Sequence, residues 1–518
     1  MKSPERLKRD LPESVEKKNP LLVAESSTQD ERRRRLCRFS VPKEGTEVLY
    51  VIGSVDENWR QKLIDWLEKD PIRKVYLIID SSYYLRYLSA PLISHPRLKV
   101  GNSISSFAWD HPYRPWESMG GTPKEEEELS TAILGVELTV ALYRDYGLCE
   151  LSNVIRNLDR EKKVRNGSAL AGKFKDIPAI ICGAGPSLEK SLNSLNSLEN
   201  RALIFGGGSV LGPLATARVP VHFLAALDPA PPYERFYRQT YFETPLFYQN
   251  QVADSLLNLH HGPKLCIGES GSFPLENWLV EEIDLPPFDV GWNVSTFATS
   301  IAHLLGCNPI YFVGLDLSVS KEGRYAKGVE GEDSRQNPLS LIDRFGSPVT
   351  TRPDFLMAKR WLEAFAQDHP ETTFINGSEG GLQLEGIGVG KIERPSKTFD
   401  LCSKIHLETI RAPLLKLEGF RKKIDTLRRS VRQVEKILAD YIDGLAMGKN
   451  VVFYDCRLDE EIFYQSYLFP NWKVWKHLLQ TDTVVRSMED PELEKKLQQI
   501  LFYQRLTEKF IDERNLCI

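Results

Sequence analysis

The feature of the sequence that most directly suggests chemistry is the turn Gly183-Ala184-Gly185-Pro186-Ser187-Leu188. It follows an apolar, strand-like run at 177–182 and precedes a helix-like segment at 189–198. Glycine permits the positive φ angles and the close backbone approach that a sharp strand-to-helix turn needs. Amides of the first helical turn then point to a place where a phosphate can bind, so we expect Ser187 to cap the helix or to donate to that phosphate. A purely structural tight turn is the alternative, because the third glycine of a dinucleotide fingerprint is missing.

A second glycine run, Gly206-Gly207-Gly208-Ser209, follows the next strand candidate, and two carboxylates follow two later ones. Two glycine turns at the ends of adjacent strands can form opposite walls of one crevice. Asp228 ends the strand-like run 223–227 and could hold a ribose hydroxyl, a metal or a protonated substrate group, or could simply be a turn aspartate. Asp316 follows a strand and a glycine, so we expect it to face a cleft.

The segment Asn293-Val294-Ser295-Thr296 opens an apolar helix that runs to Leu305 and stops at Gly306. Ser295 or Thr296 is expected to be the N-cap of this helix.

The elements that must position these residues alternate between short apolar strands and helices from about 171 to 396. This alternation predicts an α/β domain with a central, doubly wound, mostly parallel sheet of Rossmann-like type. The strand candidates are 177–182, 202–205, 222–226, 246–248, 264–267, 310–314 and 373–376. The turn at 183–188 would then lie at the carboxyl end of the first strand, where open α/β sheets bind ligands.

The sequence on either side of this domain has a different pattern. Residues 1–44 are charged and rich in polar residues, which predicts a disordered tail. Residues 45–165 contain a strand, a helix and a strand, typical of a small α/β N-terminal domain. Residues 397–518 are helical. One long amphipathic helix carries an apolar seam that is expected either to pack on the rest of the chain or to mediate self-association: Ile410, Leu414, Leu417, Ile424, Leu427, Val431, Val434, Leu438 and Tyr441. Further helices are expected at about 459–480 and 491–513.

Composition excludes several classes of protein. The 67 basic and 71 acidic residues leave a formal charge of -4, which gives no reason to expect nucleic acid as a partner. The eight cysteines are widely spaced without a CxxC pair, which argues against a zinc site or a disulfide framework. No apolar run reaches the roughly 18 to 20 residues of a membrane span. We therefore expect a cytoplasmic protein with neither a membrane span nor a zinc site, and the composition leaves a need for Mg²⁺ open.

Four ordered motifs together resemble a known family. They are GAGPSL at 183–188, GGSVLGPLATARVPVHFLAALDP at 207–229, GWNVSTFATSIAHLLGCNPIYFVGLDLS at 291–318 and FINGSEGGLQLEGI at 374–387. This order is similar to that of the bacterial motility-accessory-factor (Maf) glycosyltransferases, whose central domain is shared with archaeal-type 6-hydroxymethylpterin diphosphokinases. The resemblance implies a sialyltransferase-like fold and the transfer of a nonulosonic acid from a CMP-activated donor to a protein hydroxyl.

The resemblance also implies roles for individual residues. Gly183, Gly185, Pro186 and Ser187 would line the donor phosphate. Gly207 and Ser209 would contact the nucleotide. The reacting end would include Asp228, Asp316 and Ser295. The remaining implied positions belong to the helix start and to the last motif, which would close the pocket: Asn293, Asn376, Ser378, Glu379 and Gly380.

Two departures from the family pattern affect the expected general base. The segment after Asp316, at 321–326, has no histidine, and the position before Phe223 is His222, where the family often has aspartate. Tyr325 or Glu379 would have to substitute for the missing histidine.

Three functions remain open. The first is sugar transfer from a nucleotide-activated donor to a protein or saccharide hydroxyl, with Lys327 or Arg324 supporting the leaving phosphate. The second is pyrophosphoryl transfer from ATP to a pterin alcohol, which would need Mg²⁺ held by Asp228 and Asp316. The third is a non-catalytic nucleotide-binding assembly factor that recruits a partner through its C-terminal helices.

Overall fold

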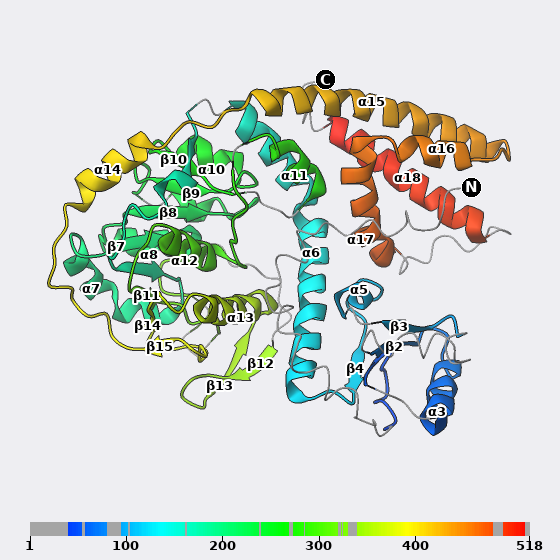
Figure 1. The fold of residues 1–518 in the computed structure, drawn as a ribbon, viewed down its shortest axis with the longest axis horizontal. Helices are drawn as coiled ribbons and strands as arrows, with labels where there is room; N and C mark the ends of the chain where they lie inside the picture. The colour runs from blue at the N-terminus through cyan, green and yellow to red at the C-terminus, as the bar shows by residue number, and fades with distance from the viewer. Residues whose placement is uncertain are drawn as a thin grey trace. The chain divides into compact units, whose positions relative to one another are not determined.

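The computed structural model describes residues 40–53, 57–79, 95–101, 104–160, 163–237, 240–268, 273–283, 285–319, 323, 325–329, 339–479 and 491–512. The expected tail at 1–44 lies, up to residue 39, outside the described residues. Figure 1 shows the fold, which divides between Arg144 and Asp145 into two compact units. This division falls inside one helix, α6 (Pro123–Arg160), and not at the expected boundary of 165–171, because the second half of α6 contributes Leu151 and Val154 to the core of the second unit.

In the N-terminal unit, four parallel strands form a sheet in the order β3-β2-β1-β4. They are β1 (Val48–Ile52), β2 (Lys74–Ile78), β3 (Leu98–Gly101) and β4 (Trp116–Met119). Helix α3 (Glu57–Glu68) joins β1 to β2 and shares a core with them, and a short helix, α5 (Ile104–Ala108), follows β3. The predicted small α/β domain is confirmed. The sequence does not predict β4, since its residues stand in a segment with the prolines and glycines of a loop.

The second unit contains the central sheet. All of its strands are parallel, and their order is β15-β14-β11-β6-β7-β8-β9-β10-β5. The strands are β5 (Arg165–Asn166), β6 (Ala179–Cys182), β7 (Leu203–Gly206), β8 (Phe223–Ala226), β9 (Leu246–Tyr248), β10 (Lys264–Cys266), β11 (Ile310–Val313), β14 (Phe374–Asn376) and β15 (Gly388–Val389). The doubly wound, mostly parallel sheet expected from the sequence is confirmed.

Helices cover both faces of this sheet, which explains why its strands read as continuous apolar runs. In β6, Ala179 and Ile181 belong to one core, and Ile180 and Cys182 belong to the core on the opposite face. The first core includes residues of α12 (Val294–Leu304), α13 (Pro353–Asp368) and α14 (Leu401–Arg411). The second includes residues of α6, α8 (Leu211–Thr216), α10 (Asp254–Leu259) and α11 (Pro274–Val280).

An antiparallel hairpin precedes α13 and is absent from the sequence-based expectation. Its strands are β12 (Leu339–Ile342) and β13 (Pro348–Thr351). The hairpin strands are partly exposed, so their residues lack the apolar pattern that marks the strands of the central sheet.

The C-terminal helices pack on one another and on α11 within the second unit (Figure 1). They are α15 (Glu418–Ala446), α16 (Val452–Leu458), a π-helical turn η8 (Tyr464–Leu468), α17 (Phe469–Leu479) and α18 (Pro491–Asp512). The predicted helical character of the C-terminal region is confirmed, and this region belongs to the same compact unit as the central sheet. Lys423 of α15 donates to the carbonyl oxygen of Trp278 at 2.5 Å and pairs with Glu281 at 2.7 Å, which fastens α15 to α11.

The apolar seam of α15 is buried against the chain's own helices. Its buried members are Phe420, Ile424, Leu427, Val431, Val434, Leu438 and Tyr441. Ile410 and Leu414, expected to belong to the seam, lie before α15 and are exposed. The seam therefore has an internal partner. No helix among the described residues is long and apolar enough to cross a membrane.

Candidate functional site

The direction of the chain across the central sheet reverses beside β6. From β6 the chain proceeds through β7, β8, β9 and β10 to one side, and then returns to place β11 on the other side of β6. In open α/β sheets, ligands bind outside the carboxyl ends of the strands at such a switch point. A cavity of about 230 Å³ lies there, and its walls come from the ends of β6, β7, β8 and β11 and from the starts of α12 and α13.

Most of the site residues predicted from the sequence line this cavity. They are Asp228, Asp316, Ser295, Gly183, Gly185, Gly207, Ser209 and Asn293. The structure thus brings together residues that are far apart in the sequence.

The first glycine turn, residues 183–188, is held by the end of β11. The amide of Gly183 donates to the carbonyl oxygen of Val313, and the amide of Gly185 donates to that of Gly314, both at 2.8 Å. A Cβ atom on Gly183 would lie 2.5 Å from the oxygen of Gly314. The close approach of two backbones therefore requires glycine here, whether or not a nucleotide binds.

The donors of Ser187 point to Asp316. The Ser187 amide donates to Asp316 Oδ2 at 2.9 Å, and the Ser187 hydroxyl donates to Asp316 Oδ1. Ser187 is buried and does not line the cavity, and Pro186 does not line it either. This differs from the expectation that Ser187 binds a donor phosphate, because the chain's own carboxylate occupies the place of that anion.

Asp316 is buried, with 6% of its surface exposed. Burial raises the pKa of its carboxyl group above the ordinary value, and the two hydrogen bonds from Ser187 oppose this rise. Since both carboxylate oxygens accept bonds from Ser187, Asp316 fastens the first glycine turn to the end of β11.

The second glycine turn, residues 206–209, is different. Gly208 has a positive φ of 55°, and a short 3-10 turn, η7 (Gly208–Val210), leads into α8. Among the described residues, none accepts a hydrogen bond from the amides of Gly208 and Ser209. Both residues line the cavity. These amides can therefore donate to a ligand anion.

The start of α12 forms a third wall. Asn293 is the N-cap, and its side chain accepts bonds from the amides of Ser295 and Thr296 at 2.9 and 3.0 Å. Thr296 Oγ1 accepts in return from the amide of Asn293, which completes a capping box. The expectation that Ser295 or Thr296 is the cap was wrong. Ser295 is thereby released from capping, and it lines the cavity beside Asn293.

Asp228 stands at the end of β8. Its Oδ1 atom accepts a bond from the amide of Ala230 at 3.1 Å, which is the turn expected for an aspartate before proline. The residue is half-buried and lines the cavity. A carboxylate in this position can accept a proton from a bound hydroxyl group.

Several cavity residues were not identified from the sequence. Arg235 and Arg352 both line the cavity. The guanidinium carbon of Arg235 lies 5.6 Å from the centroid of the Tyr325 ring, and Arg352 donates to the carboxylate of Asp354 at the start of α13. Neither arginine follows a strand of the central sheet, so the pattern of strand ends that revealed the other residues does not include them. Cys182 also lines the cavity, but burial raises the pKa of its thiol to about 12, which excludes it as a thiolate nucleophile at neutral pH.

Other expected residues lie elsewhere. Glu379 is exposed and pairs with Lys190 at 3.7 Å. Asn376 is buried, and its side-chain oxygen accepts a hydrogen bond from the amide of Ser378. The hydroxyl group of Ser378 accepts a hydrogen bond from the amide of Leu315. The last motif therefore supports the end of β11 and does not line the cavity.

Of the residues expected to act as cations or general bases, some line the cavity and others lie elsewhere. Lys327 is exposed and contacts Glu189, and Arg324 lies outside the described residues. Tyr325 lines the cavity. His222 stands before β8, away from the carboxyl ends of the strands, and its Nδ1 atom accepts the amide of Ile204 at 3.0 Å. Burial lowers the pKa of His222 to about 4, so it is neutral at physiological pH.

The carboxylates of the cavity do not form a ready Mg²⁺ site. Mg²⁺ prefers several oxygen ligands in octahedral geometry. Both oxygens of Asp316 are already engaged by Ser187, and the group of metal-ligating side chains found among the described residues does not include Asp228, Asp316 or Asp354. Ser187 would therefore compete with Mg²⁺ for the oxygens of Asp316.

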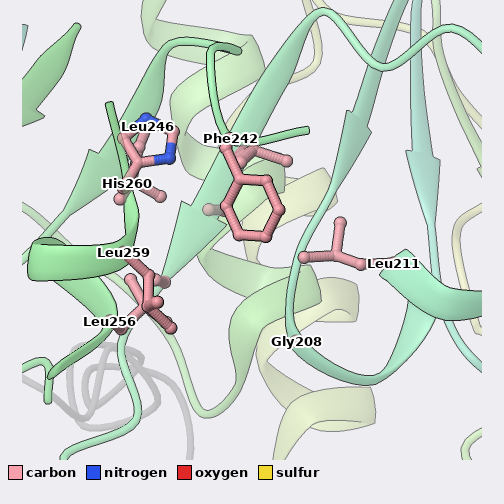
Figure 2. Close-up of a pocket in the computed structure, with 10 residues that line it drawn as sticks. Gly208, Leu211, Phe242, Leu246, Leu256, Leu259 and His260 are labelled. Atoms are coloured by element: carbon pink, nitrogen blue, oxygen red, sulfur yellow. The ribbon is translucent and has the colours of Figure 1, made fainter. Parts of the chain in front are cut away.

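A smaller, mostly apolar pocket adjoins the cavity and shares Gly208, Ala226 and Leu256 with it. Figure 2 shows the rings of Phe242 and His260 in this pocket. The Nε2 atom of His260 is buried and has no hydrogen-bond partner among the residues that the structure describes, and burial lowers the pKa of this histidine to about 4. The pocket therefore presents a neutral imidazole among apolar side chains.

Fold and site together define a doubly wound α/β protein with a ligand-sized cavity at its topological switch point. Residues 152–322 match the family model described as "6-hydroxymethylpterin diphosphokinase MptE-like". The matched segment extends from the second half of α6 to just beyond β11, and so includes both glycine turns.

The fold is similar to that of a solved structure, the MAf glycosyltransferase from Magnetospirillum magneticum AMB-1. The TM-score is 0.54 at 15% identity, and the similarity covers 98% of this chain and 84% of the other. A comparison with curated proteins gave no match. The resemblance to the Maf and MptE-like proteins is thus supported by the sequence of the central domain and by the fold of the chain.

Proposed function

We propose that this protein transfers a sugar from a nucleotide-activated donor to a hydroxyl group of a protein or saccharide. A CMP-activated nonulosonic acid is the donor that we would test first. The proposal depends on one observation: the amides of Gly208 and Ser209, which have no acceptor in the described part of the chain, belong to residues that line a cavity at the switch point of the sheet. The similarity in fold to a Maf glycosyltransferase supports the same class of reaction.

In this proposal the donor phosphate binds to the amides of Gly208 and Ser209. The start of α12, with the hydroxyl group of Ser295, lines the same cavity and favours negative charge. Arg235 and Arg352 also line it and can stabilise the charge that develops on the leaving phosphate. The first glycine turn keeps a structural role, in which Asp316 and Ser187 fix the end of β11.

The transfer step follows from these positions. The oxygen of the acceptor hydroxyl attacks the anomeric carbon of the donor sugar, and the bond from that carbon to the phosphate oxygen breaks. Asp228 accepts the hydroxyl proton as general base, and the phosphate leaves with the nucleotide. Asp228 suits this role because its carboxylate is half-buried at the cavity wall.

The test is a thermal-shift panel on the full chain with CMP-, UDP- and GDP-sugars, followed by calorimetric titration of any ligand that raises the Tm. We expect one nucleotide class to stabilise the protein in a concentration-dependent way, since a ligand that binds only the folded state shifts unfolding. Stabilisation by none of the three classes would count against the proposal.

A second candidate is pyrophosphoryl transfer from ATP to a pterin alcohol, which is favoured by the match of residues 152–322 to the MptE-like family model. The arrangement of Asp316 disfavours it, because the two hydrogen bonds from Ser187 compete with Mg²⁺ for the carboxylate oxygens. Release of AMP that depends on both Mg²⁺ and a hydroxymethylpterin would replace sugar transfer with this function.

A further inference from the structure

A cluster of two histidines and a glutamate lies at the end of α12 that is remote from the cavity. His303 is in the last turn of α12, His369 is the C-cap of α13, and Glu371 precedes β14. About 12 Å of helix separates Ser295, at the cavity, from His303. The cluster is therefore distinct from the candidate site described above.

Its three potential ligand atoms face one another. Glu371 Oε1 lies 3.4 Å from His369 Nδ1 and 3.9 Å from His303 Nε2, and all three atoms lie within 4.8 Å of one another. Tetrahedral Zn²⁺ with its usual bond lengths places neighbouring ligand atoms about 3.4 Å apart. The distance between Glu371 Oε1 and His369 Nδ1 already has this value, and small side-chain rotations would bring the other two distances between ligand atoms to it.

The surroundings orient these ligands. His303 Nδ1 lies 3.1 Å from the hydroxyl oxygen of Thr372. A proton held on Nδ1 by this contact leaves the lone pair of Nε2 directed to Glu371, which is the arrangement found around zinc-binding histidines. Asn308 fixes the same loop, since its side chain donates to the carbonyl oxygen of Glu371 at 3.3 Å and accepts the amide of Thr373 at 3.0 Å.

An ion pair alone does not account for both histidines. Their ring centroids are 4.1 Å apart, so two protonated rings would repel each other. Two imidazoles and one carboxylate are the donor set that Zn²⁺ and similar late first-row cations prefer.

We propose that His303, His369 and Glu371 bind a divalent cation of the zinc class, with a fourth position open to solvent. The cation would join the end of α12 to the loop that leads into β14, and so fix the helix whose other end lines the cavity. This proposal does not depend on the proposed transferase function. It also goes against the expectation from the cysteine spacing that the chain has no zinc site, because the ligands here are histidines and a carboxylate.

The test uses the full chain without a polyhistidine tag, stripped with a chelator and titrated calorimetrically with Zn²⁺. We expect one saturable site per chain and a rise in Tm on adding Zn²⁺. His369→Phe retains the ring that packs on Phe365 at 4.4 Å but removes the ligand atom. This variant should keep the Tm of the metal-free protein and lose both the site and the Zn²⁺-dependent rise. Glu371→Gln, at a side chain that is 63% exposed, should weaken the site without unfolding the chain.

His95→Ala is the matched control, because His95 pairs with Glu68 at 2.7 Å beside Arg97 and belongs to no group of possible metal ligands among the described residues. Its zinc titration should equal that of the unmodified protein. Thr372→Val leaves all three ligands in place and should weaken binding by about tenfold through the lost orientation of His303. The proposal would be overturned if the unmodified protein showed no saturable site, or if His369→Phe and Glu371→Gln titrated like the unmodified protein.

Discussion

The two glycine turns of the central sheet differ in what occupies them. Both follow adjacent parallel strands, β6 and β7, and both line the same cavity. In the first turn, the amide and hydroxyl of Ser187 bind the carboxylate of Asp316. In the second, the amides of Gly208 and Ser209 have no acceptor among the described residues.

This difference shows that a glycine-rich turn does not by itself identify a phosphate site. A helix start attracts an anion, and a carboxylate of the same chain satisfies that attraction as well as a ligand does. We therefore assign a structural role to the first turn and ligand binding to the second. Substitutions near the first turn should mainly change stability, and those near the second should mainly change activity or binding.

The largest expected effect is that of a substitution at Asp228, which lines the cavity together with the second turn. Asp228→Asn should reduce the rate of sugar transfer by about 100- to 10,000-fold, because the amide cannot accept the proton of the acceptor hydroxyl. The asparagine oxygen can still accept the amide of Ala230, so the turn and the Tm should be retained. Initial rates with a saturating donor provide the measurement. A rate close to that of the unmodified protein would remove Asp228 from the reaction.

The next effect concerns the first turn. Asp316→Ala leaves the buried amide and hydroxyl of Ser187 without an acceptor, which should lower the free energy of unfolding by about 1–3 kcal/mol. Urea denaturation followed by circular dichroism measures this loss. If the variant were as stable as the unmodified protein but failed to bind nucleotide, the roles assigned to the two turns would have to be exchanged.

A smaller effect is expected at the start of α12. Ser295→Ala removes a hydroxyl that lines the cavity, which should weaken nucleotide binding by about 0.5–1.5 kcal/mol, the usual contribution of one hydrogen bond. The capping box depends on Asn293 and Thr296, so the Tm should change little. Ser340→Ala, on the exposed hairpin strand β12, is the control and should leave the affinity unchanged. Equal affinities of all three proteins would remove Ser295 from the ligand site.

The smallest effect is a dependence of stability on pH. Burial raises the pKa of Asp316 in the folded protein above its ordinary value near 3.8, so just above that pH the folded chain keeps a proton that the unfolded chain has lost. The contribution of this group to stability therefore falls as the pH rises through this range. Asp316→Asn cannot titrate. Between about pH 7 and pH 4, the unmodified protein should gain stability relative to this variant, as measured by parallel urea titrations. A relative loss at low pH would show that the pKa is lowered and not raised.

Much of the central fold follows from the sequence, because the inner strands of the sheet are buried on both faces and read as short apolar runs, as at β6 and β11. The elements that the sequence does not reveal lack this signal. The hairpin strands β12 and β13 are half-exposed, and β5 and β15 have only two residues each.

The candidate site is less predictable from the sequence. Residues that directly follow strands, such as Asp228 and Gly207, could be placed at the cavity because parallel strands end at one edge of the sheet. The bond between Ser187 and Asp316 joins residues 129 positions apart, and local spacing contains no information about it. Arg235 and Arg352 belong to segments outside the strand ends, so only the structure places them at the cavity wall.

The most direct test of the account is a crystal structure of the full chain with CMP or a CMP-sugar bound. We predict that a phosphate oxygen lies within hydrogen-bonding distance of the Gly208 and Ser209 amides, while Asp316 still accepts both bonds from Ser187. A phosphate bound to the amide of Ser187, with the carboxylate of Asp316 displaced, would contradict the assignment of the two turns.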